Sequence, residues 1–214
     1  GNGGVSNTKY LVAGVFNNDD KSELSAMYDY GNEDMSLIVF TPNGFSFQTT
    51  TWFRSGRGNW GVPNTKYLVS GDYNNDGKSE ITAMYEYAGE DMSLIVFIPN
   101  GYSFQTSTWF RSGKGNWDVP HTKYFVSGDY NDDGKDELTA MYDYENEDMA
   151  MIVFKPNGLS FGTTTWFRSG RGNWSVPVTK FLTSGDYNDD NIDEISSLYD
   201  YGMDDMAVLV FKPQ

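Results

Sequence analysis

The hydrophobic and polar positions of this chain follow one pattern that returns every 57 residues. The pattern begins at Thr8–Tyr10 and returns at Thr65–Tyr67, Thr122–Tyr124 and Thr179–Phe181, without insertion or deletion. A fixed period of this length is typical of repeat proteins, in which each repeat buries its hydrophobic side against its neighbours. We therefore expect a single repeat domain over residues 1–214. Its repeats span about 8–64, 65–121, 122–178 and, incompletely, 179–214.

Within a repeat, short β-prone runs are separated by turn residues. In the second repeat these runs are Lys66–Tyr73, Glu80–Tyr87, Met92–Ile98 and Tyr102–Phe110. The third run is hydrophobic at nearly every position, as expected for a strand covered on both faces, whereas the fourth alternates as a half-exposed strand does. Four antiparallel strands per repeat with a hydrophobic centre predict an all-β fold, a β-propeller of four four-stranded blades.

The first and last repeats depart from this regularity. Gly1–Val5 aligns with Gly58–Val62, and Pro213–Gln214 aligns with Pro99–Asn100, so the last repeat lacks its fourth strand. Three interpretations stay open: a three-stranded blade, a strand supplied by a neighbouring molecule, or a chain that is part of a longer propeller. Because an exposed strand edge invites pairing, a homo-oligomer through the incomplete repeat is one expected arrangement.

An acidic loop joins the first two strands of each repeat. In the second repeat, oxygen-bearing side chains stand at loop positions 1, 3, 5 and 9, as Asp72, Asn74, Asp76 and Glu80, and the Lys78 carbonyl stands at position 7. A glycine at position 6 permits a sharp turn. Calcium takes about six to eight oxygen ligands in flexible geometry, so the loop predicts a Ca²⁺ site.

The other repeats carry the same loop with two departures. Its ligand positions are Asp129, Asn131, Asp133, Lys135 and Glu137 in the third repeat, and Asp186, Asn188, Asp190, Ile192 and Glu194 in the fourth. The fourth repeat has Asn191 in place of glycine, a residue that also tolerates a left-handed backbone. The first repeat has Val15 at position 1 and keeps only Asn17, Asp19 and Glu23, so we expect a weak or empty site there. Turn formation alone would account for one such loop, but three loops crowd like charges that a cation would offset.

The loop pattern Asp72–Glu80, following Val69–Gly71, resembles the VCBS and FG-GAP repeats. The resemblance covers all four repeats, with departures at Val15 and Asn191. It implies propeller blades that hold calcium in this loop, in secreted bacterial proteins, lectin-like propellers and integrin heads. Such propellers serve adhesion, sugar binding and enzyme anchoring alike, so the resemblance bears on fold and metal more than on function.

A second recurring motif follows the fourth strand and contains all six tryptophans. Its candidate carbohydrate-binding residues are Trp52, Arg54, Asn59 and Trp60, then Trp109, Arg111, Asn116 and Trp117, then Trp166, Arg168, Asn173 and Trp174. Indole faces stack on sugar rings while amide and guanidinium groups bond to hydroxyls. Alternatively, at least one tryptophan of each pair packs between blades and the arginine pairs with an acidic neighbour. Gly3 replaces the tryptophan at the remaining junction, so we expect three sites.

Charge and composition narrow the partners. The net charge of −15 disfavours nucleic acid and anionic membranes. There is no cysteine, and no run approaches the roughly 18 apolar residues of a membrane span. No signal-peptide pattern precedes Gly1, so we expect a mature form or an excised part of a secreted or cell-surface protein.

These observations predict a calcium-stabilised, multivalent carbohydrate-binding propeller that binds glycans or glycoconjugates with avidity. The alternative is a protein-binding adhesion or scaffold propeller attached to a larger secreted protein. An enzyme is not expected, because the single histidine, His121, stands where other repeats have Asn64 and Val178, and no nucleophile–base set is present. We also expect Met27, Met84 and Met141 to fill the core. The acidic hairpin turns are expected to be solvated, or else to extend a surface for a basic partner; they are Glu33–Asp34, Glu90–Asp91, Glu147–Asp148 and Asp204–Asp205.

Overall fold

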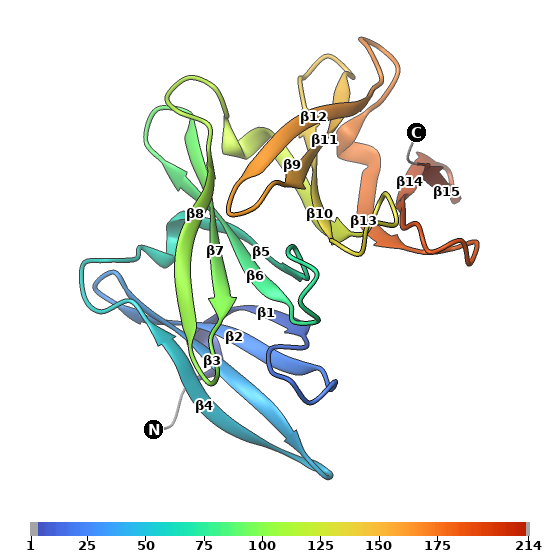
Figure 1. Ribbon diagram of the computed structural model, residues 1–214. Helices are drawn as coiled ribbons and strands as arrows, with labels where there is room; N and C mark the ends of the chain where they lie inside the picture. The colour runs from blue at the N-terminus through green and yellow to red at the C-terminus, as the bar shows by residue number, and fades with distance from the viewer. Residues whose placement is uncertain (1–3, 213–214) are drawn as a thin grey trace. The chain divides into compact units, whose positions relative to one another are not determined.

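The computed structural model describes residues 4–212, whose regular structure is β-strand apart from four short 3-10 turns (Figure 1). The strands form antiparallel sheets of four, four, four and three strands, in which each strand pairs with its neighbours in sequence. This confirms the all-β, four-bladed β-propeller arrangement. Each repeat is one sheet because short turns connect consecutive antiparallel strands.

The strand bounds follow the repeat. The first sheet contains β1 (Thr8–Gly14), β2 (Glu23–Gly31), β3 (Asp34–Asn43) and β4 (Ser46–Arg54). The second contains β5 (Thr65–Gly71), β6 (Glu80–Tyr87), β7 (Asp91–Pro99) and β8 (Phe104–Arg111). The third contains β9 (Thr122–Gly128), β10 (Glu137–Asp143), β11 (Met149–Pro156) and β12 (Phe161–Arg168). The fourth contains β13 (Thr179–Gly185), β14 (Glu194–Gly202) and β15 (Asp205–Phe211). The 3-10 turns η1 to η4 are Val5–Asn7, Val62–Asn64, Val119–His121 and Val176–Val178.

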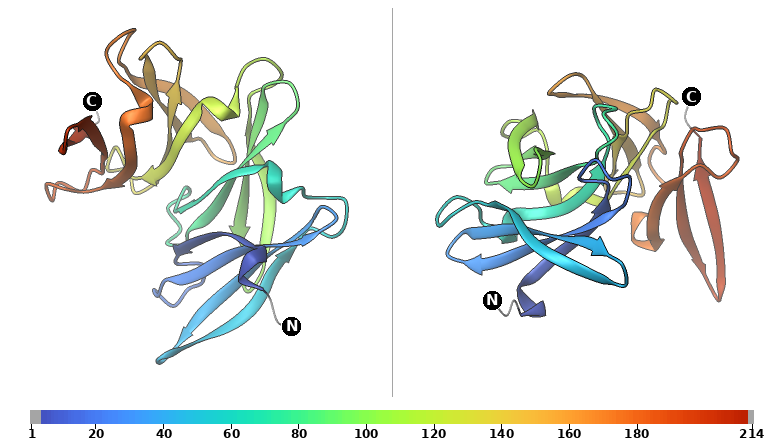
Figure 2. Two further views of the ribbon diagram at one scale, coloured as in Figure 1. Left: turned by 180° about the vertical axis from the view of Figure 1, so that it is seen from behind. Right: turned by 60° about the horizontal axis from the view of Figure 1, so that its bottom comes forward.

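Two compact units divide the chain, Gly1–Trp117 and Asp118–Gln214, and each contains two sheets. In the first unit, β1 lies beside β5 (Figures 1 and 2). Side chains of both sheets bury one hydrophobic core, which includes Met27, Leu37 and Trp52 from the first repeat and Ile81, Phe97 and Phe104 from the second. Packing of one repeat on the next therefore supplies the core, as the repeat pattern predicted.

The second unit follows the same plan. Here β9 lies beside β13, and the core includes Met141, Met151 and Val153 from the third repeat and Ile195 from the fourth. Met27, Met84 and Met141 are all buried, which confirms their predicted role as core residues.

The fourth repeat contributes three strands, and no fourth strand pairs with β15 among residues 4–212. The positions of Gly3 and of Pro213–Gln214, on which part of the sequence analysis of the ends rested, lie outside the described residues. No helix between residues 4 and 212 is long and apolar enough to cross a membrane.

Candidate functional site

The acidic loops join the first two strands of each sheet, and the glutamate at position 9 opens the second strand. All four of these glutamates are buried: Glu23, Glu80, Glu137 and Glu194. In the second repeat the Glu80 carboxylate accepts the Tyr73 backbone N–H at 3.0 Å and the Asn74 side-chain N–H at 2.8 Å. The same two bonds recur in every repeat, to the residues at positions 2 and 3. In each loop, two hydrogen bonds thus connect positions 2 and 3 to the glutamate at position 9.

The aspartate at position 1 organises the rest of the loop. The Asp72 carboxylate accepts backbone N–H groups of Asn74, Asp76 and Gly77 at 3.3, 3.2 and 2.8 Å. The residue at position 6 has a left-handed backbone in all four loops: φ is 56° at Asp20, 80° at Gly77, 76° at Gly134 and 64° at Asn191. The expectation that Asn191 adopts the glycine conformation is confirmed. Val15 offers no carboxylate for this bonding in the first loop.

Charge and burial shift the acidity of the buried glutamates. Burial raises the pKa of Glu80 to about 8, and the negative charges of Asp76 and Asp72 also raise it. The hydrogen bond from the Tyr73 backbone N–H acts in the opposite direction and lowers it. Burial likewise raises the pKa of Glu137 to about 7. Burial, more than neighbouring charge, thus makes these two glutamates weaker acids than an exposed glutamate.

Calcium fits this donor chemistry, because the loops carry carboxylate, amide and carbonyl oxygens in one short segment. The side chains are not gathered as a finished metal centre, however. Among residues 4–212, no group of three or more His, Cys, Asp or Glu side chains lies close enough to hold a metal ion. The asparagine at position 3 donates its side-chain amide N–H to the glutamate. Calcium binding stays a prediction.

Without calcium, the free energy of unfolding is expected to fall as the pH rises from about 5 to about 8. Folding raises the pKa of Glu80 and Glu137 above their ordinary value, so the folded protein keeps protons that the unfolded chain releases. This contribution is complete below pH about 4.5 and is lost as the pH passes the folded pKa values. Urea denaturation at several pH values in a chelator measures it, and Glu80→Gln should flatten the upper part of the profile. A stability that rises across this window would contradict the assignment.

Neighbouring acidic loops are joined within each unit. The Ser79 N–H donates to the Val15 carbonyl at 2.7 Å in the first unit, and the Asp193 N–H donates to the Asp129 carbonyl at 2.7 Å in the second. The approach is close enough that a Cβ on Gly128 would lie 2.5 Å from an Asp193 carboxylate oxygen. Glycine at this position therefore permits the contact.

Four of the six tryptophans of the second motif are buried. Trp52, Trp60, Trp109 and Trp117 are buried, whereas Trp166 and Trp174 are partly exposed. The Trp52 ring lies 5.3 Å from the Phe104 ring, and the Trp60 indole N–H donates to the Thr65 hydroxyl at 2.9 Å. Four of the six indoles thus serve as packing surfaces. In the first two pairs this agrees with the alternative that at least one tryptophan of each pair packs in the core, whereas neither tryptophan of the third pair is fully buried.

The arginines of the motif are exposed and held in place. Arg54 donates to both carboxylate oxygens of Asp34, at 3.2 and 2.9 Å, and its guanidinium lies 4.2 Å from the centre of the Tyr30 ring. The same three residues recur in the next two repeats. We call these sets the arginine clusters: Tyr30, Asp34 and Arg54; Tyr87, Asp91 and Arg111; Tyr144, Asp148 and Arg168.

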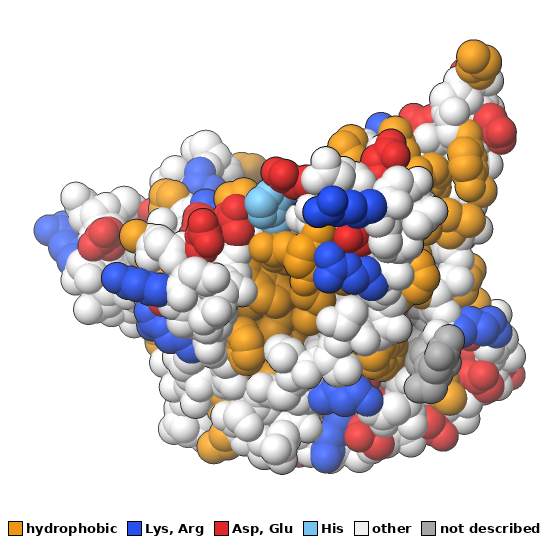
Figure 3. Space-filling model, turned by 90° about the horizontal axis from the view of Figure 1, so that it is seen from above, with side chains coloured by type: hydrophobic (Ala, Val, Ile, Leu, Met, Phe, Trp, Pro, Cys, Tyr) orange, Lys and Arg blue, Asp and Glu red, His pale blue; other side chains and the backbone are white. Residues whose placement is uncertain are grey.

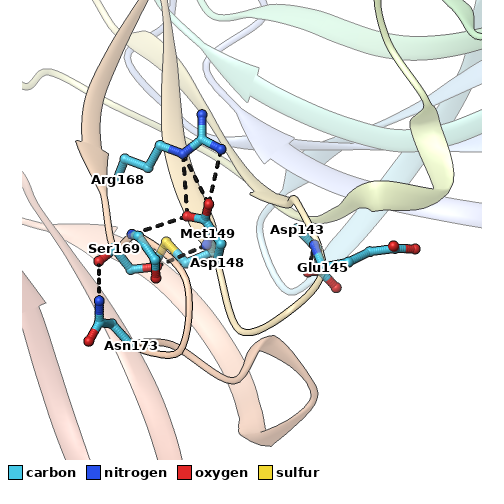
Figure 4. Close-up of polar contacts among 8 residues, drawn as sticks. Asp143, Glu145, Asp148, Met149, Arg168, Ser169 and Asn173 are labelled. Carbon is cyan, nitrogen blue, oxygen red and sulfur yellow. Dashed lines mark hydrogen bonds and ion pairs between the residues drawn. The ribbon is translucent and has the colours of Figure 1, made fainter.

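Figure 4 shows the third arginine cluster with its supporting bonds. Arg168 reaches Asp148 from the end of β12, and the Ser169 hydroxyl accepts the Met149 N–H at 2.9 Å. Asn173 donates its side-chain N–H to the Ser169 carbonyl at 2.9 Å. Hydrogen bonding from the arginine lowers the pKa of each cluster aspartate. The predicted asparagines therefore brace the glycine-rich link beside the arginine.

The arginine clusters correct one expectation. Asp34, Asp91 and Asp148 were expected in solvated hairpin turns, but they are buried against their arginines. The other residues of these turns are exposed as expected, namely Glu33, Glu90, Glu147, Asp204 and Asp205. Sequence reasoning missed the buried aspartates and the tyrosines. The available signal was the constant spacing, since an aspartate precedes each arginine by twenty residues.

The single histidine, pale blue in Figure 3, lies among acidic side chains. His121 Nδ1 lies 3.0 Å from Asp118, and Nε2 lies 3.4 Å from Glu145. Both ring nitrogens of His121 therefore face carboxylates of the same unit.

Comparisons with known proteins bear on the fold. No protein-family description matches this chain, and no curated protein matches it. Among solved structures, the crystal structure of AofleA from Arthrobotrys oligospora is similar, with a TM-score of 0.53 and 13% sequence identity over 94% of this chain. The match covers 52% of that protein, so this chain spans about half its length. At this identity the likeness supports the β-propeller fold alone.

Proposed function

We propose that the chain is a calcium-stabilised, multivalent carbohydrate-binding module of the VCBS and FG-GAP repeat type. The observation that carries this proposal is the threefold recurrence of the arginine cluster, in which each arginine donates two side-chain N–H groups to its aspartate and lies over a tyrosine ring. A packing device has no need of exposed guanidinium groups at equal intervals. A module that binds repeated groups on a glycan surface gains avidity from them.

The arginine cluster has the chemistry of a sugar site. The arginine side chains are about half exposed, and their bonds to the aspartate use two of the five N–H donors of the guanidinium. The remaining donors suit the oxygens of hydroxyl groups, and Tyr30 and Tyr144 expose their rings beside them. Since the ion pair and the stacked ring fix the guanidinium beforehand, little conformational entropy is lost on binding. We therefore assign the carbohydrate sites to the arginine clusters instead of the tryptophans.

The carbohydrate proposal is tested by a glycan array in calcium-containing buffer. The triple variant R54K/R111K/R168K keeps the charges but loses the planar fork, and should lower avidity by about 100-fold. Lys114→Ala, on the same link but outside the cluster, is the matched control and should bind as the parent does. No bound glycan from folded protein, or full binding by the triple variant, would refute this site.

The calcium proposal rests on the acidic loops of the second, third and fourth repeats. Saturating Ca²⁺ is expected to raise the melting temperature by at least about 5 °C over chelator, because a ligand of the folded state stabilises it. Asp129→Val copies the natural Val15 of the first loop into the third, and should reduce both the shift and the number of ions bound in calorimetry. Equal melting temperatures with calcium and with chelator would refute calcium stabilisation.

A protein-binding scaffold is the second candidate. It is favoured by exposed hydrophobic side chains on the first and last sheets, including Phe45, Phe47, Met206 and Val208. Both candidates are binding functions in a secreted or surface protein, and we propose no catalytic role.

A further inference from the structure

The first sheet carries exposed hydrophobic side chains at positions that are buried one repeat later. Leu11 and Phe47 are 60% and 53% exposed, whereas their counterparts Leu68 and Phe104 are 8% and 5% exposed. Leu68 and Phe104 belong to the core that joins the second sheet to the first. The first sheet thus presents to solvent the face that a blade uses to pack on the blade before it. We call it the leading face.

The last sheet presents the opposite kind of face. Val208 and Val210 are exposed on β15, whereas their counterparts in the first repeat, Leu37 and Val39, are fully buried against the second sheet. The corresponding Met151 and Val153 of the third repeat are likewise buried, in the core of the second unit. The last sheet therefore exposes the face that a blade uses to receive the next blade. We call it the trailing face.

A groove in the second unit marks where further contacts are lacking. It has a volume of about 430 Å³ and is lined by Trp166, Phe167 and Phe211, among others. In the first unit, the counterpart Trp52 is covered by Tyr102, between β7 and β8, and by Phe104, the first residue of β8. Among residues 4–212, no strand of the fourth repeat supplies these rings, and one edge of β15 is unpaired. Unpaired strand edges and apolar grooves both favour association.

We propose that the trailing face of one chain packs on the leading face of a second copy of this chain, head to tail. The two faces are the two halves of the contact that the first unit already shows between β1–β4 and β5–β8, so a copy of this chain has the complementary surface. Contacts between two different faces are heterologous and build closed rings or open chains.

Light scattering coupled to size exclusion tests this assembly, with the protein at several concentrations. The mass should be twice 24.1 kDa or a higher multiple. Phe47→Glu and Val208→Glu each place a charge on one face at an exposed position, and each alone should reduce the mass toward 24.1 kDa without loss of β-sheet circular dichroism. Gln105→Glu, exposed on β8, is the control and should assemble normally.

Mixing the two variants distinguishes a head-to-tail contact from a symmetric contact between identical faces. Each variant retains the face that the other lacks, so an equimolar mixture should recover assemblies of two chains, which a symmetric contact between identical faces would not allow. A parent protein of 24.1 kDa at all concentrations would overturn the proposal, and lower melting temperatures of both variants would then place the contact within one chain. A dimer that neither variant dissociates would also overturn it.

Discussion

Replacing Trp52 with alanine is expected to lower the free energy of unfolding by about 3–5 kcal/mol. Trp52 is buried in the core of the first unit, where its ring lies 5.7 Å from the Tyr102 ring and 5.3 Å from the Phe104 ring. Truncation removes the buried apolar surface and leaves a cavity between two sheets that cannot close fully. Urea denaturation followed by circular dichroism measures the change.

The matched control is the same substitution two repeats later. Trp166 is partly exposed and borders the groove of the second unit, with Tyr130 as a ring neighbour at 5.2 Å. Because less surface is buried there, Trp166→Ala should cost about half as much. If Trp52→Ala instead left stability unchanged and abolished glycan binding, its indole would be a ligand platform and the packing role would be wrong.

Replacing Glu80 with alanine is expected to lower the free energy of unfolding by about 3 kcal/mol. The Glu80 carboxylate is fully buried and accepts hydrogen bonds from the Tyr73 backbone and the Asn74 side chain. Removing it leaves a buried backbone N–H without its acceptor and opens the start of β6. The measurement is again urea denaturation, made with and without calcium.

Two further variants interpret that result. Glu86→Ala removes a partly exposed glutamate on β6, the strand that also contains Glu80, and should cost less than about 1 kcal/mol. The Glu86 carboxylate pairs with Lys66 of β5 at 3.0 Å. Glu80→Gln keeps the shape and one acceptor, so it should cost less than alanine while reducing any stabilisation by calcium. Stability of Glu80→Ala equal to the parent protein in chelator would show that the loop does not depend on this carboxylate.

Much of the fold follows from local patterns. The predicted strand Glu80–Tyr87 has the same bounds as β6. The predicted strand Met92–Ile98 is one residue shorter than β7 at each end. The left-handed residue at loop position 6 was also predicted, including Asn191. These features depend on neighbours within one repeat, so the sequence of that repeat contains their causes.

The candidate sites were predicted less completely. The motif around Trp52 and Arg54 was identified, but its roles were not separable in sequence, because tryptophan and arginine suit both packing and sugar binding. The structure divides the roles. The indoles enter the core, and Arg54 reaches back across the sheet to Asp34, a residue that looked like an ordinary turn position.

The sequence by itself determined the four repeats, their strands, the acidic loops and the three arginines, since each is written in the residue pattern of a single repeat. Only the tertiary structure decided which of these surfaces are covered. Leu11 and Leu68 are the same residue at the same place in the pattern, yet Leu11 is exposed and Leu68 is buried. The reason is physical: burial depends on whether a neighbouring sheet covers the side chain, and the pattern of one repeat does not contain its neighbour.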